Sequence, residues 1–459
     1  MYIEDTIVAP ATAPGTGAVA IIRLSGPKSA AILKAIWRPI ANGSLGPRRL
    51  YLGDVVDPVT NSHIDRAMAV FFPKPQSLTG EDVAELQCHG GSYLVRRITG
   101  IATSLGARMA EPGEFTRRAF LNGCIDLTEA EAVADLVEAR GESALQQAIS
   151  HLTGALAEKL GGLRRELISI RAHLEAEIDF SDEGIKLPSR SEIASSIERL
   201  TRDVAILHES YARGRLMREG AHVAIVGKPN VGKSSILNLL LGTDRAIVTA
   251  IPGTTRDVIE DSIQIGGYPV VLQDTAGIRE SFDEVEKIGI QRSERSLKDA
   301  DLVIAVFDSS APLADEDVAI AHHVRGRVGI ALLNKNDLPI KVGTDDLRAI
   351  EVEIPVLSFS ALHADGVENL KCELLRAIET LRGPYQGEEV AISRERHRDA
   401  LARALEALSA AKHSALQSMP PEIIAVDVTL AADALGQITG EVHTEDVLDA
   451  VFREFCIGK

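Results

Sequence analysis

The sequence predicts a multidomain protein that combines α/β and all-α parts, with a P-loop domain inserted into a helical bundle. A glycine-rich loop lies at 227–234, near the middle of the 459 residues, between an apolar run and a helical pattern. Apolar residues spaced by three or four positions extend over long stretches on both sides of this loop, as in bundle helices. The first 120 residues instead contain short apolar runs separated by turn residues, which is typical of an α/β domain.

The central loop has the sequence Gly-Lys-Pro-Asn-Val-Gly-Lys-Ser over residues 227–234. It follows the apolar strand pattern of 222–226 and precedes the helical pattern of 236–241, which is the context of a phosphate-binding P-loop. In such a loop Lys233 reaches the β- and γ-phosphates and the Ser234 hydroxyl holds Mg²⁺. A glycine loop alone is often only a turn, so the assignment depends on three further motifs.

The first of these is Asp274-Thr-Ala-Gly277, at the end of the apolar strand 270–272. A carboxylate at that strand end can accept a hydrogen bond from a Mg²⁺-bound water, and the Gly277 N–H can contact the γ-phosphate. These two groups would complete a site for the triphosphate.

The other two motifs predict guanine as the base. Asn334-Lys-Asn-Asp337 follows the strand 328–333, and the acceptor-only carboxylate of Asp337 matches the N1–H and N2–H₂ donors of guanine. Ser360-Ala361 follows 356–359, and its backbone would contact guanine O6. The four motifs together predict a Ras-like P-loop G domain that hydrolyses GTP.

Composition limits the other possibilities. No run of eighteen or more apolar residues occurs, so no membrane span is expected, and the acidic start lacks the apolar core of a signal peptide. Four cysteines, Cys88, Cys124, Cys372 and Cys456, lie far apart without metal-ligand or CxxC spacing. We therefore expect reduced thiols and a cytoplasmic location.

The net charge of −17 is unevenly distributed. Residues 1–120 contain 13 Lys and Arg against 10 Asp and Glu, a balance of +3, which leaves −20 for residues 121–459. Residues 121–459 are too acidic to bind a nucleic acid by neutralising its phosphates alone. An RNA substrate would need a local basic patch or a basic partner subunit.

Residues 1–120 are predicted to form the N-terminal α/β domain. Strands are expected at 18–24, 67–72 and 83–88, and helices at 28–36 and from 89 towards 105. The segment 111–122 closes this domain.

The helical domain is expected in two parts, 121–216 and 384–459, on either side of a G domain at 217–383. Thr128-Glu-Ala-Glu131 has a capping-box pattern, which predicts a long helix from there to about residue 180. Its apolar stripe consists of Leu145, Ile149, Leu152, Leu156, Leu160, Leu163, Leu167, Ile170, Leu174 and Ile178. After a break at 182–188, further helices are expected at 193–211, 397–416, 422–438 and 444–455, with the last three packed against 128–214.

Several motifs outside the G domain carry a family resemblance. They are Asp5-Thr-Ile-Val-Ala, Arg23-Leu-Ser-Gly26, Thr79-Gly-Glu-Asp82, His89-Gly-Gly91, Pro112-Gly-Glu-Phe115 and the terminal Cys456-Ile-Gly-Lys459. With the P-loop set, the sequence from Asp5 to Lys459 resembles the MnmE (TrmE) family of bacterial tRNA-modification GTPases. The terminal Cys-x-Gly-Lys after an inserted G domain is the most specific of these features.

The resemblance implies a function that composition does not show. Such proteins are homodimers that work with MnmG, an FAD protein, in a heterotetramer or larger complex. Together they add a carboxymethylaminomethyl or aminomethyl group to C5 of the wobble uridine (U34) of certain tRNAs. The one-carbon unit comes from 5,10-methylene- or 5-formyl-tetrahydrofolate, held by the N-terminal domain, which dimerises to form the site.

By match to the family, Arg23, Glu81 and Lys459 would contact this folate. Cations suit the anionic groups of the ligand, and a glutamate can accept from the pterin N–H edge. An ordinary surface ion pair remains the alternative for Arg23 and Glu81. The family usually has a lysine where this chain has Cys124, so Arg117 or Arg118 is a candidate for the missing charge.

The hydrolytic machinery must differ from that of small GTPases, because Ile278 follows Asp-Thr-Ala-Gly277 and cannot orient water. The resemblance implies a K⁺ ion in place of an arginine finger, with Mg²⁺ held by Ser234 and Thr255. Glu286 would orient the attacking water and Arg279 would order its loop. The implied K⁺ ligands are Asn230, Thr249, Ile251 and Thr254.

Simpler interpretations stay open for some of these residues. Asn230 could be only a turn residue and Glu286 only part of a solvated helix start, while Arg256 is expected to be structural. Cys456 is a candidate nucleophile or redox group, although no base is visible beside it in the sequence. The full set expected to bind GTP is Asn230, Val231, Gly232, Lys233, Ser234, Ser235, Thr249, Thr255, Asp274, Thr275, Ala276, Gly277, Asn334, Lys335, Asp337, Ser360 and Ala361.

Other GTPase classes fit less well. A ribosome-assembly GTPase of the Era type needs a basic RNA-binding domain, and one of the Der type needs a second P-loop, which this chain lacks. A regulatory GTPase on a helical scaffold would not account for the N-terminal motifs.

Overall fold

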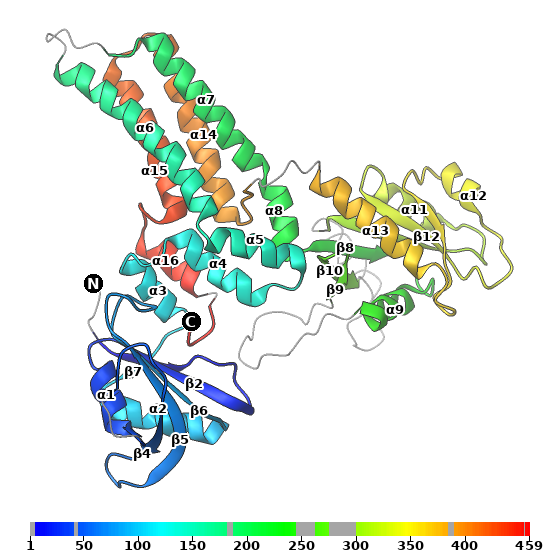
Figure 1. Cartoon of the computed structure of the whole chain (residues 1–459). Helices are drawn as coiled ribbons and strands as arrows, with labels where there is room; N and C mark the ends of the chain where they lie inside the picture. Colours follow the sequence, from blue (N-terminus) through cyan, green and yellow to red (C-terminus); the bar gives the residue numbers. More distant parts are fainter. Residues whose placement is uncertain are drawn as a thin grey trace.

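The computed structural model describes residues 5–40, 45–180, 187–244, 262–274, 300–383, 390–453 and 455–459. The molecule has three parts: an N-terminal α/β part, an elongated helical part and a G-type α/β part. The helical part lies between the other two (Figure 1). The predicted fold class is confirmed: the G domain is inserted between two segments that contribute to one helical bundle.

The N-terminal part is a seven-stranded sheet in the order β3-β4-β5-β6-β2-β1-β7. The strands predicted at 18–24, 67–72 and 83–88 are present as β2, β5 and β6, whereas β1, β3, β4 and β7 were not predicted from the sequence. The strands are β1 Ile7–Pro10, β2 Gly17–Ser25, β3 Trp37–Pro39, β4 Tyr51–Val56, β5 His63–Phe72, β6 Val83–Gly90 and β7 Arg108–Met109. The helices are α1 Ser29–Ile36, α2 Ser92–Ser104 and α3 Glu114–Leu121.

The prediction of one long helix from 128 to about 180 is wrong. Three helices occupy this stretch: α4 Leu127–Glu138, α5 Glu142–Leu152 and α6 Ala155–Asp179. Gly141 has an extended backbone before α5, and Gly154, with φ of 83°, precedes α6 in the left-handed region. Glycine adopts the left-handed conformation at 154 without steric cost, and the extended backbone at 141 interrupts the helix there. The chain therefore turns twice although the apolar spacing continues.

The start of α4 also differs from the prediction. The N-cap is Asp126, whose side chain accepts hydrogen bonds from the backbone N–H groups of Thr128 and Glu129. The Glu129 carboxylate in turn accepts from the Asp126 N–H at 2.8 Å. The capping box is therefore Asp126–Glu129 rather than Thr128–Glu131, and Glu131 is left for another role.

The bundle is built by α6, α7, α14 and α15, which lie side by side in Figure 1. Their buried leucine, isoleucine, valine and alanine side chains form one apolar cluster that includes Leu167 and Leu435. The remaining helices of the two segments are shorter and lie between the bundle and the other domains. The bounds are α7 Arg190–Glu209, α8 Tyr211–Glu219, α14 Glu395–Leu416, α15 Pro421–Thr439 and α16 Glu445–Phe452.

The G-type part has a six-stranded sheet in the order β13-β12-β11-β8-β10-β9, in which only β9 is antiparallel to its neighbour. The strands are β8 Ala221–Val226, β9 Ser262–Ile265, β10 Tyr268–Asp274, β11 Leu302–Asp308, β12 Gly329–Asn334 and β13 Val356–Ser358. The helices are α9 Lys233–Asp244, α11 Asp315–Val324, α12 Thr344–Ala349 and α13 Val367–Arg382. The strand before the P-loop, β8, lies inside the sheet, so the loop after it projects from the carboxyl edge.

Within the described ranges, none of the helices combines the length and the apolar character that crossing a bilayer requires.

Replacement of Leu167 by alanine is expected to destabilise the bundle by about 2–5 kcal/mol, because the side chain is fully buried and its loss leaves a cavity. Ile206→Ala on α7 is the matched control, since that side chain is 58% exposed and its loss should cost about 0.5 kcal/mol or less. Urea denaturation followed by far-ultraviolet circular dichroism measures both. Equal midpoints for the two variants would contradict the assignment of the bundle core.

Candidate guanine-nucleotide and chain-end sites

The P-loop has the backbone shape that a phosphate cradle requires. Asn230 has φ of 62° and Gly232 has φ of 104°, so both lie in the left-handed region. A Cβ on Gly232 would lie 2.3 Å from the Asn334 amide nitrogen, so this position requires glycine. The Lys233 ammonium folds back over the loop and donates to the carbonyls of Gly227 at 2.8 Å and Lys228 at 2.9 Å. Lys233, Ser234 and Ser235 open α9, at the positive end of its helix dipole.

Asn334 joins three of the predicted motifs. Its side-chain amide, which is buried, donates to the Val231 carbonyl of the P-loop at 2.7 Å. Its amide oxygen accepts from the Ala361 N–H at 3.0 Å. Segments more than 100 residues apart are therefore held in one site by a single side chain, and Val231 contributes through its backbone.

The carboxylate predicted to select guanine is also held in place. Asp337 accepts a hydrogen bond from the Ser360 hydroxyl at 2.6 Å, and this bond lowers the pKa of Asp337 below its usual value. Because an ionised carboxylate only accepts hydrogen bonds, it matches the two adjacent donors of guanine. Lys335, with φ of 65°, donates to Asp308 at 2.6 Å.

Asp308 was missed by the sequence analysis. It ends the buried strand β11, next to the strand that leads to Asn334. A polar residue at the carboxyl end of an apolar parallel strand is the signal that could have identified it.

Some predicted residues fall outside the described part of the chain: Thr249, Ile251, Thr254, Thr255, Arg256, Thr275, Ala276, Gly277, Ile278, Arg279 and Glu286. Their assignments to Mg²⁺, K⁺ and catalysis therefore stay predictions. Asp274 is the last residue of β10 and is paired in register with Ile225 of β8, two residues before Gly227. This pairing places the Asp274 backbone beside the start of the P-loop.

A second candidate site lies where the C-terminal tail, residues 455–459, docks on the N-terminal part. The Phe115 N–H donates to the Lys459 carbonyl at 3.2 Å, and the Gly113 N–H donates to the Cys456 carbonyl at 3.3 Å. Gly458 has φ of 99°, and a Cβ there would lie 2.1 Å from the Pro10 carbonyl oxygen. The tail is thus fixed by its backbone, and glycine is required for its close approach.

This docking brings Arg23, Cys456 and Lys459 together. Arg23 donates to Glu85 at 2.8 Å and approaches the Gly458 carbonyl at 3.5 Å. Burial lowers the pKa of the Lys459 ammonium, the nearby Cys456 thiol opposes this shift, and Arg23 adds to it. Lys459 lies three residues after Cys456, and its backbone N–H donates to the Cys456 carbonyl at 3.4 Å.

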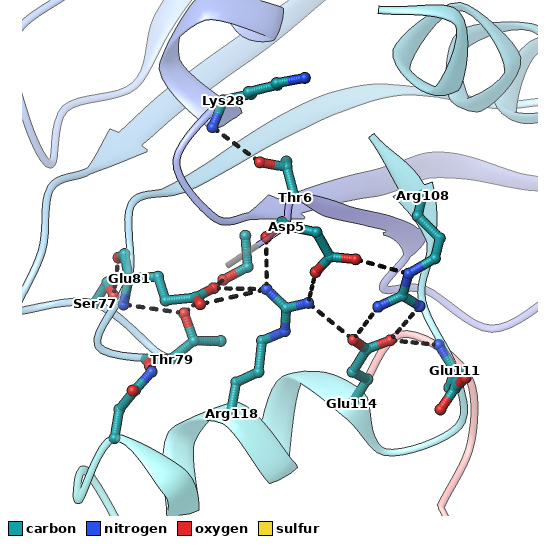
Figure 2. Close-up of polar contacts among 12 residues, drawn as sticks. Asp5, Thr6, Lys28, Ser77, Thr79, Glu81, Arg108, Glu111, Glu114 and Arg118 are labelled. Atoms are coloured by element: carbon teal, nitrogen blue, oxygen red, sulfur yellow. Dashed lines mark hydrogen bonds and ion pairs between the residues drawn. The ribbon is translucent and has the colours of Figure 1, made fainter. Parts of the chain in front are cut away.

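Glu81 lies at one end of a buried ion-pair cluster (Figure 2). Arg118, whose side chain is 4% exposed, donates to both Glu81 oxygens at 3.1 and 3.3 Å and to Glu114 at 2.9 Å. Glu81 also accepts from the Ser25 hydroxyl at 2.6 Å, and Arg118 also pairs with Asp5 at 2.5 Å. These contacts fix the orientation of the Glu81 carboxylate.

The two candidates for the cation missing at Cys124 have different surroundings. Arg117 pairs with Glu445 at 2.7 Å and Asp449 at 3.0 Å on α16, so its charge is directed away from Glu81. Arg118 is buried among carboxylates and acts on the neighbourhood of Glu81 by orienting it. Cys124 is exposed, with its sulfur close to Gly80.

The P-loop, the Asn334 bridge and the Asp337 carboxylate on this sheet define a guanine-nucleotide-binding GTPase of the P-loop class. Comparison with known families covers nearly the whole chain. Residues 6–124 match the model of the GTP-binding protein TrmE N-terminus, and residues 127–456 match that of the MnmE helical domain. The chain belongs to the MnmE family of tRNA modification GTPases.

Individual relatives agree with this assignment over their full length. The tRNA modification GTPase MnmE of Natranaerobius thermophilus is 44% identical over 457 residues, which are 99% of this chain and 100% of the relative. That of Geobacter sulfurreducens is 42% identical, with 100% of both chains covered. Among solved structures, the G domain of the T. maritima FeoB iron transporter is 29% identical over 35% of this chain and 99% of that chain, with a TM-score of 0.27.

Asp337→Asn is expected to weaken GTP binding by about 100-fold, because the amide would place a donor opposite a guanine donor. The same variant should prefer xanthosine triphosphate, whose base has an acceptor in place of the N2 amino group. Titration with fluorescent nucleotides measures both affinities, with Asp345→Asn, whose side chain is 95% exposed, as the control. Unchanged GTP affinity in Asp337→Asn would remove Asp337 from the base site.

Proposed function

We propose that this chain hydrolyses GTP while it takes part, with an FAD-containing MnmG partner, in modification of C5 of the wobble uridine U34 of tRNA. The added group would be carboxymethylaminomethyl or aminomethyl. The observation that carries the proposal is the family match over the full length of the chain. This match favours tRNA modification over the Era- or Der-type alternative.

The GTPase half of the proposal assigns the ions as follows. Mg²⁺ would be held by Ser234 and Thr255, and K⁺ by Asn230, Thr249, Ile251 and Thr254. Two features of Asn230 support its part in this assignment: its backbone is left-handed, a conformation that Asn adopts more readily than most residues, and its side chain is exposed. A monovalent cation beside the phosphates would offset the charge that develops during transfer, with Glu286 orienting water and Arg279 ordering its loop.

The folate half of the proposal assigns Arg23, Glu81 and Lys459 to a reduced folate that carries the one-carbon unit. The positions support this assignment, since the docked tail places Lys459 near Arg23, and Arg118 orients Glu81. Cys456 lies beside this cluster and is proposed as a participant in the chemistry at the uridine. In a homodimer formed by the N-terminal domains, two such sites would lie close together.

The tRNA would be bound mainly by surfaces other than the acidic residues 121–459 of this chain. Residues 121–459 have a balance of −20, which repels a polyanion. A basic surface of the MnmG partner is the simplest source of phosphate contacts. A cytoplasmic location follows from the tRNA substrate.

Potassium dependence tests the GTPase assignment. GTP hydrolysis is expected to be about tenfold or more faster in KCl than in NaCl, because the ion would substitute for an arginine finger. Asn230→Gly retains the left-handed backbone but removes the side chain, so this variant should lose the difference between the salts. Glu286→Ala should lose turnover and still bind GTP; equal wild-type rates in both salts would eliminate the mechanism.

Lys459→Ala is expected to weaken 5-formyl-tetrahydrofolate binding by about 10- to 100-fold, because it removes a charged donor. Affinity of the wild type should also fall as the pH rises, and at lower pH than for an ordinary lysine, because burial lowers the pKa of Lys459 and the neutral amine loses its charge. Lys459→Arg should bind with less dependence on pH. Calorimetric titration measures these affinities, with exposed Arg453→Ala as the control; an unaltered affinity in Lys459→Ala would exclude the residue.

Mass spectrometry of tRNA from a strain that lacks the gene tests the biological role. Unmodified U34 is expected in the affected tRNAs, and the wild-type gene should restore the modification. Fully modified U34 in the deletion strain would contradict the proposed function.

A further inference from the structure

Helix α4 contains two carboxylates on one buried face. Glu131 and Asp135 are one helical turn apart, and their side chains are 3% and 9% exposed. Two like charges in such a place are costly unless each is paired. Both are paired, and their partners come from the segments that lead into and out of the G domain.

Asp135 holds both of these connections at once. Its Oδ1 accepts from Arg218 Nε at 2.8 Å and from Arg394 at 2.7 Å. Arg218 lies in the last turn of α8, three residues before β8, the strand that leads to the P-loop. Arg394 is the N-cap of α14, where the chain returns from the G domain to the bundle. One carboxylate oxygen therefore fixes the two chain connections relative to α4.

Glu131 fixes the same helix to the bundle. It accepts from Arg396 at 3.1 Å and from His397 Nε2 at 2.8 Å. Arg396 also donates to the carbonyls of Gln437 and Ile438 at the end of α15. Burial lowers the pKa of His397 to about 4, so a neutral imidazole donates to Glu131 at pH 7.

The apolar face of α4 packs on the helix that leads to the tail. Leu127, Ala130 and Ala134 form one cluster with Leu448, Val451, Phe452 and Phe455. Phe455 is followed directly by Cys456, and the tail then docks against Gly113 and Phe115. A displacement of α4 would therefore move α16 and the backbone of the chain-end site.

The helical part meets the G domain through two kinds of contact: Leu216 of α8 is buried in the apolar core of the G domain, and polar groups meet elsewhere. A cavity of about 770 Å³ separates them, lined by His222, Gln273 and Asp301 of the G domain and by Arg394, Arg396 and Val451 of the helical part. Beyond the cavity, Gln264 donates to the Arg140 carbonyl just after α4. The polar groups around this cavity can change partners with less loss of packing than an apolar core can.

From this arrangement we propose that α4 transmits the nucleotide state of the G domain to the C-terminal tail, with Asp135 as its positioning residue. This inference rests on the proposed function of the two sites. When the G domain changes state, Arg218 and Arg394 shift together, Asp135 carries α4 with them, and α16 repositions Cys456 and Lys459. Both sites bias one shared element, which is the physical requirement for coupling.

Asp135→Asn in the full-length protein tests the inference, because the amide retains the shape but loses the charge that holds both arginines. Its GTP hydrolysis rate should stay within about twofold of the wild type, whereas modified uridines per GTP hydrolysed should fall by about tenfold or more. Asp135→Glu should restore the ratio. Asp54→Asn, which removes a half-buried carboxylate paired with Arg66 in the N-terminal sheet, is the matched control.

Hydrogen exchange gives a second readout that does not require modification. In the wild type, the amides of Gly113 and Phe115, which donate to the tail, should change protection between the GDP and GDP–aluminium fluoride states. In Asp135→Asn this change should disappear. Arg218→Gln removes one of the two guanidinium groups that pair with Asp135, so it should also reduce the change in protection. This variant replaces Asp135→Asn in the experiment if Asp135→Asn does not fold.

Two results would overturn the inference. In the first, the variants keep both the wild-type number of modified uridines per GTP hydrolysed and the wild-type change in hydrogen exchange. In the second, hydrolysis and modification fall in parallel, so that the number of modified uridines per GTP hydrolysed stays unchanged. Failure of the proposed function is distinguishable, because it would show as no modification by the wild type, while the exchange experiment would still report on α4.

Discussion

The packing of α6 and α7 against α14 and α15 is the contact on which the rest of the structure depends. These pairs of helices lie on opposite sides of the G domain in the sequence, yet their side chains form one core. Neither pair could bury its apolar face alone, so the bundle forms only when the chain returns from the G domain. Both ends of the G domain are consequently anchored to one rigid body, and any rotation of that domain acts on the same helices.

The second long-range contact follows from the first. Because α14 and α15 bring the chain back along the bundle, α16 arrives beside α4 and the tail reaches the N-terminal sheet (Figure 1). Arg23 and the Gly458 carbonyl, 435 positions apart in sequence, then approach each other. Because the tail continues from α16, a displacement of the helical part would shift one side of this interface relative to the other.

Sequence predicted best what local conformation determines. The P-loop, the Asn334–Asp337 motif and the helices predicted at 193–211, 397–416 and 422–438 follow from contiguous residues, and the structure has them close to those positions. The apolar spacing from Leu145 to Ile178 could not show the two breaks, because the periodicity continues across Gly141 and Gly154. The ion pair of buried Arg118 with Glu81, and the two ion pairs of Asp135 with Arg218 and Arg394, depend on tertiary contacts between distant segments. No local pattern contains that information.

The central claim is that the energy of GTP hydrolysis in one domain serves chemistry at the chain-end site. A reconstituted reaction with purified protein, its FAD partner, tRNA and a reduced folate tests this most directly, with GTP compared against a non-hydrolysable analogue. We expect modified uridine with GTP and little or none with the analogue, although both nucleotides bind. Equal modification with the two nucleotides would contradict the central claim.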